Sequence, residues 1–174
     1  SPAPSGFGIV FQTSTPYQTL IPATPENVVD SRFATTLGVN GSRVQTVEHF
    51  MAAAGALGIT NLLVEVEGAE IPALDGSARP FAALLRDAGR VVQSLPQEPL
   101  VITQAIRVGD ESRWLQILPS QEFRISYTLD LDHPAVPTQA ASFLCTEQVF
   151  LDELASARTY GFLKDVGTLR KNGL

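Results

Sequence analysis

The chain has 174 residues, of which 44% are apolar and 17% are charged, and its formal net charge is −6 at pH 7. This length suffices for one medium domain or two small ones, and this composition is typical of a globular chain rather than a disordered one. The negative charge argues against nucleic acid or an anionic membrane surface as the main partner, and no apolar run reaches the roughly 20 residues that span a bilayer. The single cysteine, Cys145, excludes an internal disulfide framework and favours the cytoplasm.

The first predicted elements are short strands. Residues 7–11 and 17–21 are rich in strand-forming residues and are separated by a polar turn. The pair Asn40-Gly41 predicts a hairpin, because both residue types tolerate a positive φ. Residues 61–68 alternate apolar and acidic side chains, which predicts a half-buried strand.

Two helices are predicted among these strands. The first has Thr46 as its expected N-cap and Gly58 as its end. Its apolar residues recur at the spacing of one buried helix face: Val47, Phe50, Met51, Ala54 and Leu57. The second helix is expected to be capped by Ser77, to carry Pro80 in its first turn and to end at Gly89.

The second half of the chain follows a polar stretch with two prolines at 91–99. It predicts a hairpin over 99–119, a long alternating strand over 122–132 and a further strand ending at Cys145. A helix over 146–157 is expected to be capped by its first residue, a threonine. The prediction is an α+β fold of two units, 1–95 and 96–174, each a sheet with helices on one face.

Glu48 and His49 stand side by side at the opening of the first predicted helix. Neighbours on a helix point about 100° apart, so these two side chains can flank one point in a cleft. A histidine nitrogen can hold a zinc ion, and the adjacent carboxylate can take a proton from the water at that ion. The structural alternative is an acidic residue in a first turn beside a surface histidine, and zinc sites usually have three protein ligands rather than one.

Two loops admit both a structural and a functional interpretation. His133 could join Asp130 and Asp132 as a ligand cluster, although a corner before a proline is the simpler account of DLDHPAV. The Asp-Gly-Ser turn at 75–77 is explained by a turn and a helix cap, and its alternative is a loop that faces a substrate.

The segment ARTYGF, 157–162, interrupts the third helical region with a hydroxyl, a cation and two aromatic rings. The hydroxyl of Thr159 could donate to an oxyanion at a tetrahedral centre. The aromatic side chains could hold a sugar face or an acyl chain. The structural alternative is an ordinary strand that buries Tyr160 and Phe162.

In order along the chain, these stretches resemble one family. TVEHFMAAAGALGITNLLVEVEGAEIPALDGSARPF closely resembles the signature region of the zinc-dependent UDP-3-O-acyl-N-acetylglucosamine deacetylases of lipid A biosynthesis. DLDHPAV and SARTYGFLKDVGTLRKNGL resemble the same family in the expected order, so the resemblance runs from about Ala3 to Leu174. It implies two similar two-layer α+β domains with the active site between them, the second domain being incomplete here.

The resemblance also implies roles for individual residues. His49 matches a zinc ligand, Glu48 matches the general base, and Thr159 matches a hydroxyl that assists the tetrahedral oxyanion. The implied cofactor is Zn2+.

Three aromatic residues match substrate-binding positions of the family. Tyr160 and Phe162 match positions beside the sugar and the acyl chain. Phe33, together with its neighbours Arg32 and Ala34, matches a stretch near the cleft.

The chain departs from the family pattern at both ends. The family has two further zinc ligands in a His-Lys-x-x-x-Asp motif, then a histidine that is the general acid, and this chain stops before both. The opening strands of the family are also missing, and the chain begins with Ser rather than Met. The chain therefore resembles an internal fragment that holds the base and one zinc ligand.

The expected function is the zinc-dependent deacetylation, an amide hydrolysis, of UDP-3-O-acyl-N-acetylglucosamine in lipid A biosynthesis. The fragment alone is expected to be inactive. The expected partner is the acylated UDP-sugar substrate, with no nucleic acid and no integral membrane segment, and the complete protein is expected to be a cytoplasmic monomer. The alternative is a non-catalytic module of the same fold that binds a sugar nucleotide or a protein.

Overall fold

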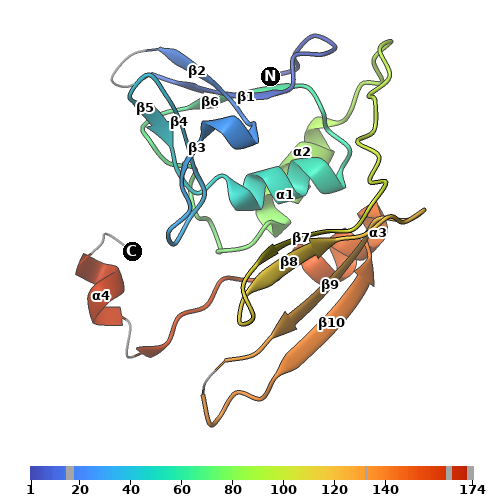
Figure 1. Cartoon of the computed structure of the whole chain (residues 1–174). Helices are drawn as coiled ribbons and strands as arrows, with labels where there is room; N and C mark the ends of the chain where they lie inside the picture. The colour runs from blue at the N-terminus through green and yellow to red at the C-terminus, as the bar shows by residue number, and fades with distance from the viewer. Residues whose placement is uncertain (15–17, 132, 164–165, 172–174) are drawn as a thin grey trace.

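The structure is a computed structural model of the chain, and it describes residues 1–14, 18–131, 133–163 and 166–171. Strands and short helices are mixed along the chain, so the predicted α+β fold class is confirmed (Figure 1). Within the described ranges, no helix combines the length and the apolar character that crossing a membrane requires.

Two three-stranded sheets lie in the first half of the chain. One has the order β2-β1-β6, with β1 antiparallel to β2 and parallel to β6. Its strands are β1 (Ile9–Thr13), β2 (Thr19–Pro22) and β6 (Leu62–Val66). The other sheet is antiparallel, and its strands are β3 (Val28–Asp30), β4 (Thr36–Val39) and β5 (Ser42–Val44).

The prediction of a single sheet in this half is therefore wrong. Pro22 ends β2, and Pro25 opens the short 3-10 helix η1 (Pro25–Asn27), which leads into the second sheet. Proline has no backbone N–H, so it cannot continue a strand ladder at these positions. The predicted hairpin at Asn40-Gly41 is confirmed, because both residues have a positive φ (50° and 84°) between β4 and β5.

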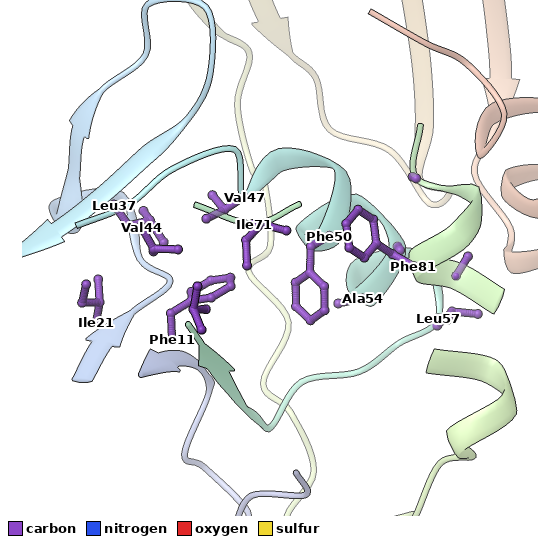
Figure 2. Packing of buried hydrophobic residues seen from close by; sticks show 14 residues of the cluster. Phe11, Ile21, Leu37, Val44, Val47, Phe50, Ala54, Leu57, Ile71 and Phe81 are labelled. Carbon is purple, nitrogen blue, oxygen red and sulfur yellow. The ribbon is translucent and has the colours of Figure 1, made fainter. Parts of the chain in front are cut away.

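Helices α1 (Glu48–Ala56) and α2 (Arg79–Ala88) pack together against the sheets. Phe50 of α1 lies at the centre of the core, edge to face with Phe11 of β1 and with Phe81 of α2, at 5.8 Å between ring centroids in each pair (Figure 2). The other buried apolar members of this core are Ile21, Leu37, Val44, Val47, Ala53, Ala54, Leu57, Val66, Ile71, Ala78 and Ala82. This single cluster fixes the orientation of α1.

The predicted N-cap of α1 is wrong. The residue before Glu48 is Val47, and Thr46 has a φ of 61°, so its hydroxyl points away from the helix and donates a hydrogen bond to Oε1 of Glu70 at 2.7 Å. The predicted end is confirmed, because Gly58 follows the helix with a φ of 66°.

The boundaries of α2 are close to those predicted. Ser77 lies one residue before the cap position, and its hydroxyl accepts a hydrogen bond from the backbone N–H of Arg79 at 3.3 Å. Gly89 ends the helix with a φ of 80°, as predicted.

In the described part of the second half there are two separate two-stranded antiparallel sheets and the helical segments named below. The strands are β7 (Ile106–Gly109), β8 (Trp114–Ile117), β9 (Arg124–Leu129) and β10 (Gln139–Leu144). The helical segments are α3 (Glu147–Val149), the π-helix η2 (Phe150–Leu154) and α4 (Val166–Lys171). Thr146 caps α3 as predicted, because its hydroxyl accepts from the N–H of Val149 at 3.2 Å.

Polar contacts tie the segment after α2 to both halves. The guanidinium of Arg90 donates to the carbonyl of Leu57 at the end of α1 (2.6 Å) and to the carboxylate of Glu147 in α3 (2.8 and 3.3 Å). The two halves therefore meet around α1 and α2 (Figure 1). The division into domains near residue 95 stays a prediction.

Candidate active site

The carboxylate of Glu48 is held at the first turn of α1. Its Oε2 accepts a hydrogen bond from the backbone N–H of Thr35 at 3.0 Å, and the side chain is half-buried. Val47 adds a weaker backbone bond, from its N–H to the carbonyl of Thr35 at 3.4 Å. Within the described part of the chain, Oε1 of Glu48 accepts no hydrogen bond. One carboxylate oxygen is therefore fixed while the other is available to take a proton.

His49 follows Glu48 on α1 and is also half-buried. The pair stands between two buried apolar residues, Val47 and Phe50, which pin this end of the helix to the core. The start of α1 is therefore held in place by the buried Val47 and Phe50, while the side chains of Glu48 and His49 are half-buried. The roles of Glu48 as base and His49 as ligand stay predictions.

Phe33 lies on the loop that leads to Thr35. Its side chain is 66% exposed and its φ is 66°, a left-handed conformation that costs a bulky residue about 1–3 kcal/mol. The neighbouring Arg32 forms an ion pair with Asp30 at 2.8 Å, and its hydrogen bonds hold the pKa of the Asp30 carboxyl well below its usual range. The loop thus presents an aromatic ring two residues from the amide that holds Glu48.

The segment from 155 to 163 begins at the buried Ala155 and then becomes exposed. Thr159 is exposed and Tyr160 is 60% exposed, so the alternative of a strand that buries both aromatic residues is wrong for Tyr160. Phe162 is half-buried, with its ring edge to face with that of Tyr160 at 6.0 Å. The hydroxyl and one aromatic ring are accessible to a ligand.

The half-buried His133 packs with this aromatic group. Its ring stacks on that of Phe162, with centroids 5.0 Å apart and an interplanar angle of 16°, and its Nδ1 accepts from the N–H of Ala135 at 3.2 Å. Asp130 accepts a hydrogen bond from the Thr138 hydroxyl instead. Asp132, the third member of the candidate cluster, lies outside the described residues. These contacts favour the structural corner.

The loop 69–77 lies between the two parts of the candidate site. It pairs with Gln45, just before α1, through hydrogen bonds from the N–H of Gln45 to Ala69 (2.9 Å) and from the N–H of Ile71 to Gln45 (3.0 Å). At its other end Ser77 forms a β-bridge with Arg158. Among the described residues, no direct hydrogen bond or ring contact joins Glu48 or His49 to Thr159 or Tyr160. The structure therefore connects the two parts through this loop.

The donor set for a metal is incomplete among the residues that the structure describes. No group of three or more His, Cys, Asp or Glu side chains gathers in metal-binding geometry within the described ranges. His49 could fill one ligand position, because its side chain is half-buried at the helix start and it follows Glu48, whose carboxylate a backbone amide orients. Zinc sites usually have three protein ligands, so the described residues can supply only part of such a site.

A model of the UDP-3-O-acyl N-acetylglycosamine deacetylase family matches residues 1–174, the whole chain. The chain belongs to this family. Curated relatives named UDP-3-O-acyl-N-acetylglucosamine deacetylase include proteins of Myxococcus xanthus (48% identical, 99% of this chain and 55% of the relative), Syntrophotalea carbinolica (42%, 99% and 56%) and Helicobacter pylori strain 26695 (37%, 96% and 56%). The chain spans about half the length of the curated relatives it matches.

Membership of the deacetylase family confirms the resemblance that the motifs indicate. What sequence reasoning missed is the part played by the Asp-Gly-Ser turn. Its Asp75 lies 3.4 Å from the guanidinium of Arg158, 83 residues further along the chain. Only two features of the sequence could have suggested this contact. Arg158 stands beside Thr159, whose hydroxyl is a predicted catalytic group, and Asp75 is an acidic residue in a turn with a structural explanation.

Proposed function

We propose that this chain is the part of a zinc-dependent deacetylase that supplies the general base, one zinc ligand and part of the substrate-binding surface. The observation that carries the proposal is the Glu48-His49 pair, held at a fixed helix start by the Thr35 amide and the core. Family membership over the whole chain supports the reaction class. The proposed substrate is UDP-3-O-acyl-N-acetylglucosamine, and the products are acetate and the free 2-amino sugar nucleotide.

Glu48 performs the proton transfer in this proposal. A water oxygen attacks the acetamide carbonyl carbon, and Oε1 of Glu48 takes the proton that the water loses. The Oε2 bond to the Thr35 amide holds the carboxylate in one orientation during this step. The C–N bond then breaks, and the leaving amine takes a proton from a general acid outside this chain.

Thr159 and the aromatic residues act on the substrate. The Thr159 hydroxyl donates a hydrogen bond to the oxyanion that develops on the former carbonyl oxygen. Tyr160, Phe162 and Phe33 contact the sugar and the acyl chain, and the exposure of Phe33 and Tyr160 leaves their rings free to do so.

His49 is proposed as one zinc ligand, with the remaining ligands supplied by residues outside this chain. Bound zinc supplies Lewis-acid polarisation of the carbonyl and lowers the pKa of water. With one imidazole, the 174-residue chain alone is expected to bind zinc weakly and to release no acetate.

The test compares Glu48→Gln and Glu48→Ala in the complete protein encoded by the reading frame that contains this chain. Glutamine keeps an oxygen that can accept from the Thr35 amide but cannot act as a base, so both variants should lose about 10²–10⁴-fold in kcat. Acetate release is measured with zinc content determined alongside. Undiminished turnover in Glu48→Gln would remove the role of general base.

The metal role has a separate readout. His49→Ala should lower the zinc content of the complete protein, whereas Glu48→Gln should retain it. A complete protein that binds the sugar nucleotide but neither holds zinc nor releases acetate would be the non-catalytic module instead.

A further inference from the structure

The Asp-Gly-Ser turn before α2 is organised around the carboxylate of Asp75. Its Oδ1 accepts hydrogen bonds from the backbone N–H and the hydroxyl of Ser77, at 3.0 and 2.7 Å, and Ser77 is fully buried. The residues on either side, Leu74 and Gly76, both have a positive φ (52° and 79°). The backbone therefore turns sharply on both sides of Asp75 and sets the direction of its side chain.

The second oxygen of the same carboxylate faces the other half of the chain. Oδ2 of Asp75 lies 3.4 Å from a terminal guanidinium nitrogen of Arg158, and Ser77 pairs with Arg158 in an antiparallel β-bridge. The hydrogen bonds from Ser77, and then the one from Arg158, lower the pKa of the Asp75 carboxyl, so the charge that faces Arg158 is present at neutral pH. The ion pair and the β-bridge therefore both join the turn at 75–77 to Arg158 in the 155–163 segment.

Stability alone does not account for this pair. Both side chains are substantially exposed, and exposed ion pairs contribute little to the free energy of folding. Their effect is directional instead: the Asp75 carboxylate is already oriented by a buried serine, so it loses little additional freedom when Arg158 binds there. Because Asp75 holds Arg158 in one direction, it also restricts the position of the adjacent Thr159.

We propose that Asp75 is a positioning residue, which through Arg158 holds the hydroxyl of Thr159 in a fixed place relative to the Glu48-His49 helix start. The loop 69–77 provides the rigid connection, because its other end pairs with Gln45, three residues before Glu48. The inference rests on the proposed function for the role of Thr159, and it adds that the two parts of the site keep their spacing through this one loop.

The test uses the complete protein with Asp75→Asn, Arg158→Gln and the double variant. Asparagine can still accept from Ser77 through its side-chain oxygen but removes the charge that faces Arg158. Each single variant should lower kcat by roughly tenfold, as expected when a reacting group is misplaced, with KM within about twofold. The double variant should fall no further than either single variant, because the two residues act as one unit.

A Thr159→Val background shows whether the loss of kcat in Asp75→Asn depends on the Thr159 hydroxyl. In a Thr159→Val protein the hydroxyl is gone, so adding Asp75→Asn should cause no further loss of kcat. A full additional tenfold loss in that background would overturn the proposal, because Asp75 would then act by another route.

The matched control is Glu147→Gln. Among the residues that the structure describes, Glu147 forms the other ion pair between the two halves, with Arg90, and its side chain is 37% exposed against 38% for Asp75. Glu147→Gln removes the same kind of charge from an ion pair that includes neither Asp75 nor Arg158, and it should leave kcat unchanged. Equal losses of kcat in Asp75→Asn and Glu147→Gln would show a general loosening between the halves and would overturn the proposal.

A readout without catalysis separates this inference from the proposed function. The backbone amide signals of Arg158 and Thr159 in ¹⁵N-labelled complete protein should shift or broaden in Asp75→Asn and stay in place in Glu147→Gln. Unchanged signals in Asp75→Asn would overturn the positioning role even in an active enzyme. A wild-type protein that releases no acetate would overturn the proposed function, and the spectra would still decide the position of Thr159.

Discussion

The regions 1–89 and 106–144 both contain short strands with alternating side chains, but their burial differs sharply. Phe11 and Ile21 in the first region are fully buried, whereas Phe123 in the second is 71% exposed. Apart from Ala155, the buried apolar residues of the described ranges all lie between Ala3 and Ala82. The first region has helices packed across its sheets, and the second has two small sheets without such a layer.

The difference shows what a strand pattern does and does not determine. Alternation predicts which residues share a face of a strand, and pairing then follows from backbone hydrogen bonds. Burial needs a second layer, and an isolated two-stranded sheet is marginally stable in water. The site reflects the same contrast, because Glu48 and His49 stand on the packed region, whereas Thr159 is exposed and its neighbour Arg158 pairs with Asp75.

The largest expected consequence is a difference in amide hydrogen exchange within the 174-residue chain. Amides in β1 and β6 should exchange only through global unfolding, whereas those in β7 and β8 should open locally. We expect protection factors at least about 10³-fold higher in the first pair of strands. The exchange is followed by NMR or mass spectrometry, and comparable protection in both pairs would refute the distinction.

The next largest expected effect is a difference in the free energy of unfolding between matched Phe→Ala substitutions in the two regions. Phe50→Ala removes the ring that contacts both Phe11 and Phe81, and should lower the free energy of unfolding by about 3–5 kcal/mol. Phe123→Ala removes the same side chain at an exposed position, and should change it by less than about 0.5 kcal/mol. Denaturant titration measures both, and a loss above 2 kcal/mol in Phe123→Ala would reveal a core in the second region.

The sequence was sufficient where local chemistry decides the structure. Asn40-Gly41 predicted its hairpin because a positive φ is a property of the residues themselves. The cap at Thr146 followed the same logic. Thr46 failed as a cap because a tertiary partner, Glu70, takes its hydroxyl, and no local pattern encodes that choice.

The candidate site divides in the same way. The Glu48-His49 pair is contiguous, so its position on one helix start could be predicted from the sequence. The contact between Asp75 and Arg158 joins residues far apart in the chain, and it depends on how the loop before α2 packs against the 155–163 segment. The proposed role of Phe33 depends on a left-handed backbone conformation, which its residue type does not favour.

Two turn glycines offer a smaller and more local comparison. Gly41→Ala meets no neighbouring atom but forces alanine into a φ of 84°, so it should destabilise the first region by about 1 kcal/mol. The control is Gly55→Ala in α1, where a Cβ also meets open space and φ is not positive, and it should stabilise by about 0.5–1 kcal/mol.

The corresponding change in the second region is Gly109→Ala. An added Cβ would clash with the backbone of Arg113 across the hairpin, so β7 and β8 should separate. Because this hairpin carries no part of the buried core, the free energy of unfolding of the first region should change by less than about 0.5 kcal/mol. NMR of the β7 and β8 amides shows the local loss, and a global loss of stability would mean that the two regions unfold together.

The smallest expected effect is a dependence on pH confined to the turn between β7 and β8. The hydroxyl of Ser112 and the amides of Arg113 and Ser112 donate to the Asp110 carboxylate, and these bonds lower its pKa from 3.8 to about 2. Because the pKa is lower in the folded turn, the stabilisation is fully present above pH 3.8 and is lost as the pH falls through about 2.

The measurement is an NMR titration of the turn amides. In the wild type the Ser112 and Arg113 amide signals should move with a midpoint near pH 2, and in Asp110→Asn that transition should disappear. The first region contributes a control, because the backbone N–H of Gly8 donates to the side-chain oxygen of Asn61 at 2.9 Å and neither group titrates. A midpoint near 3.8 would mean that the turn is already open in the 174-residue chain, which would extend the contrast between the packed and unpacked regions down to a single hairpin.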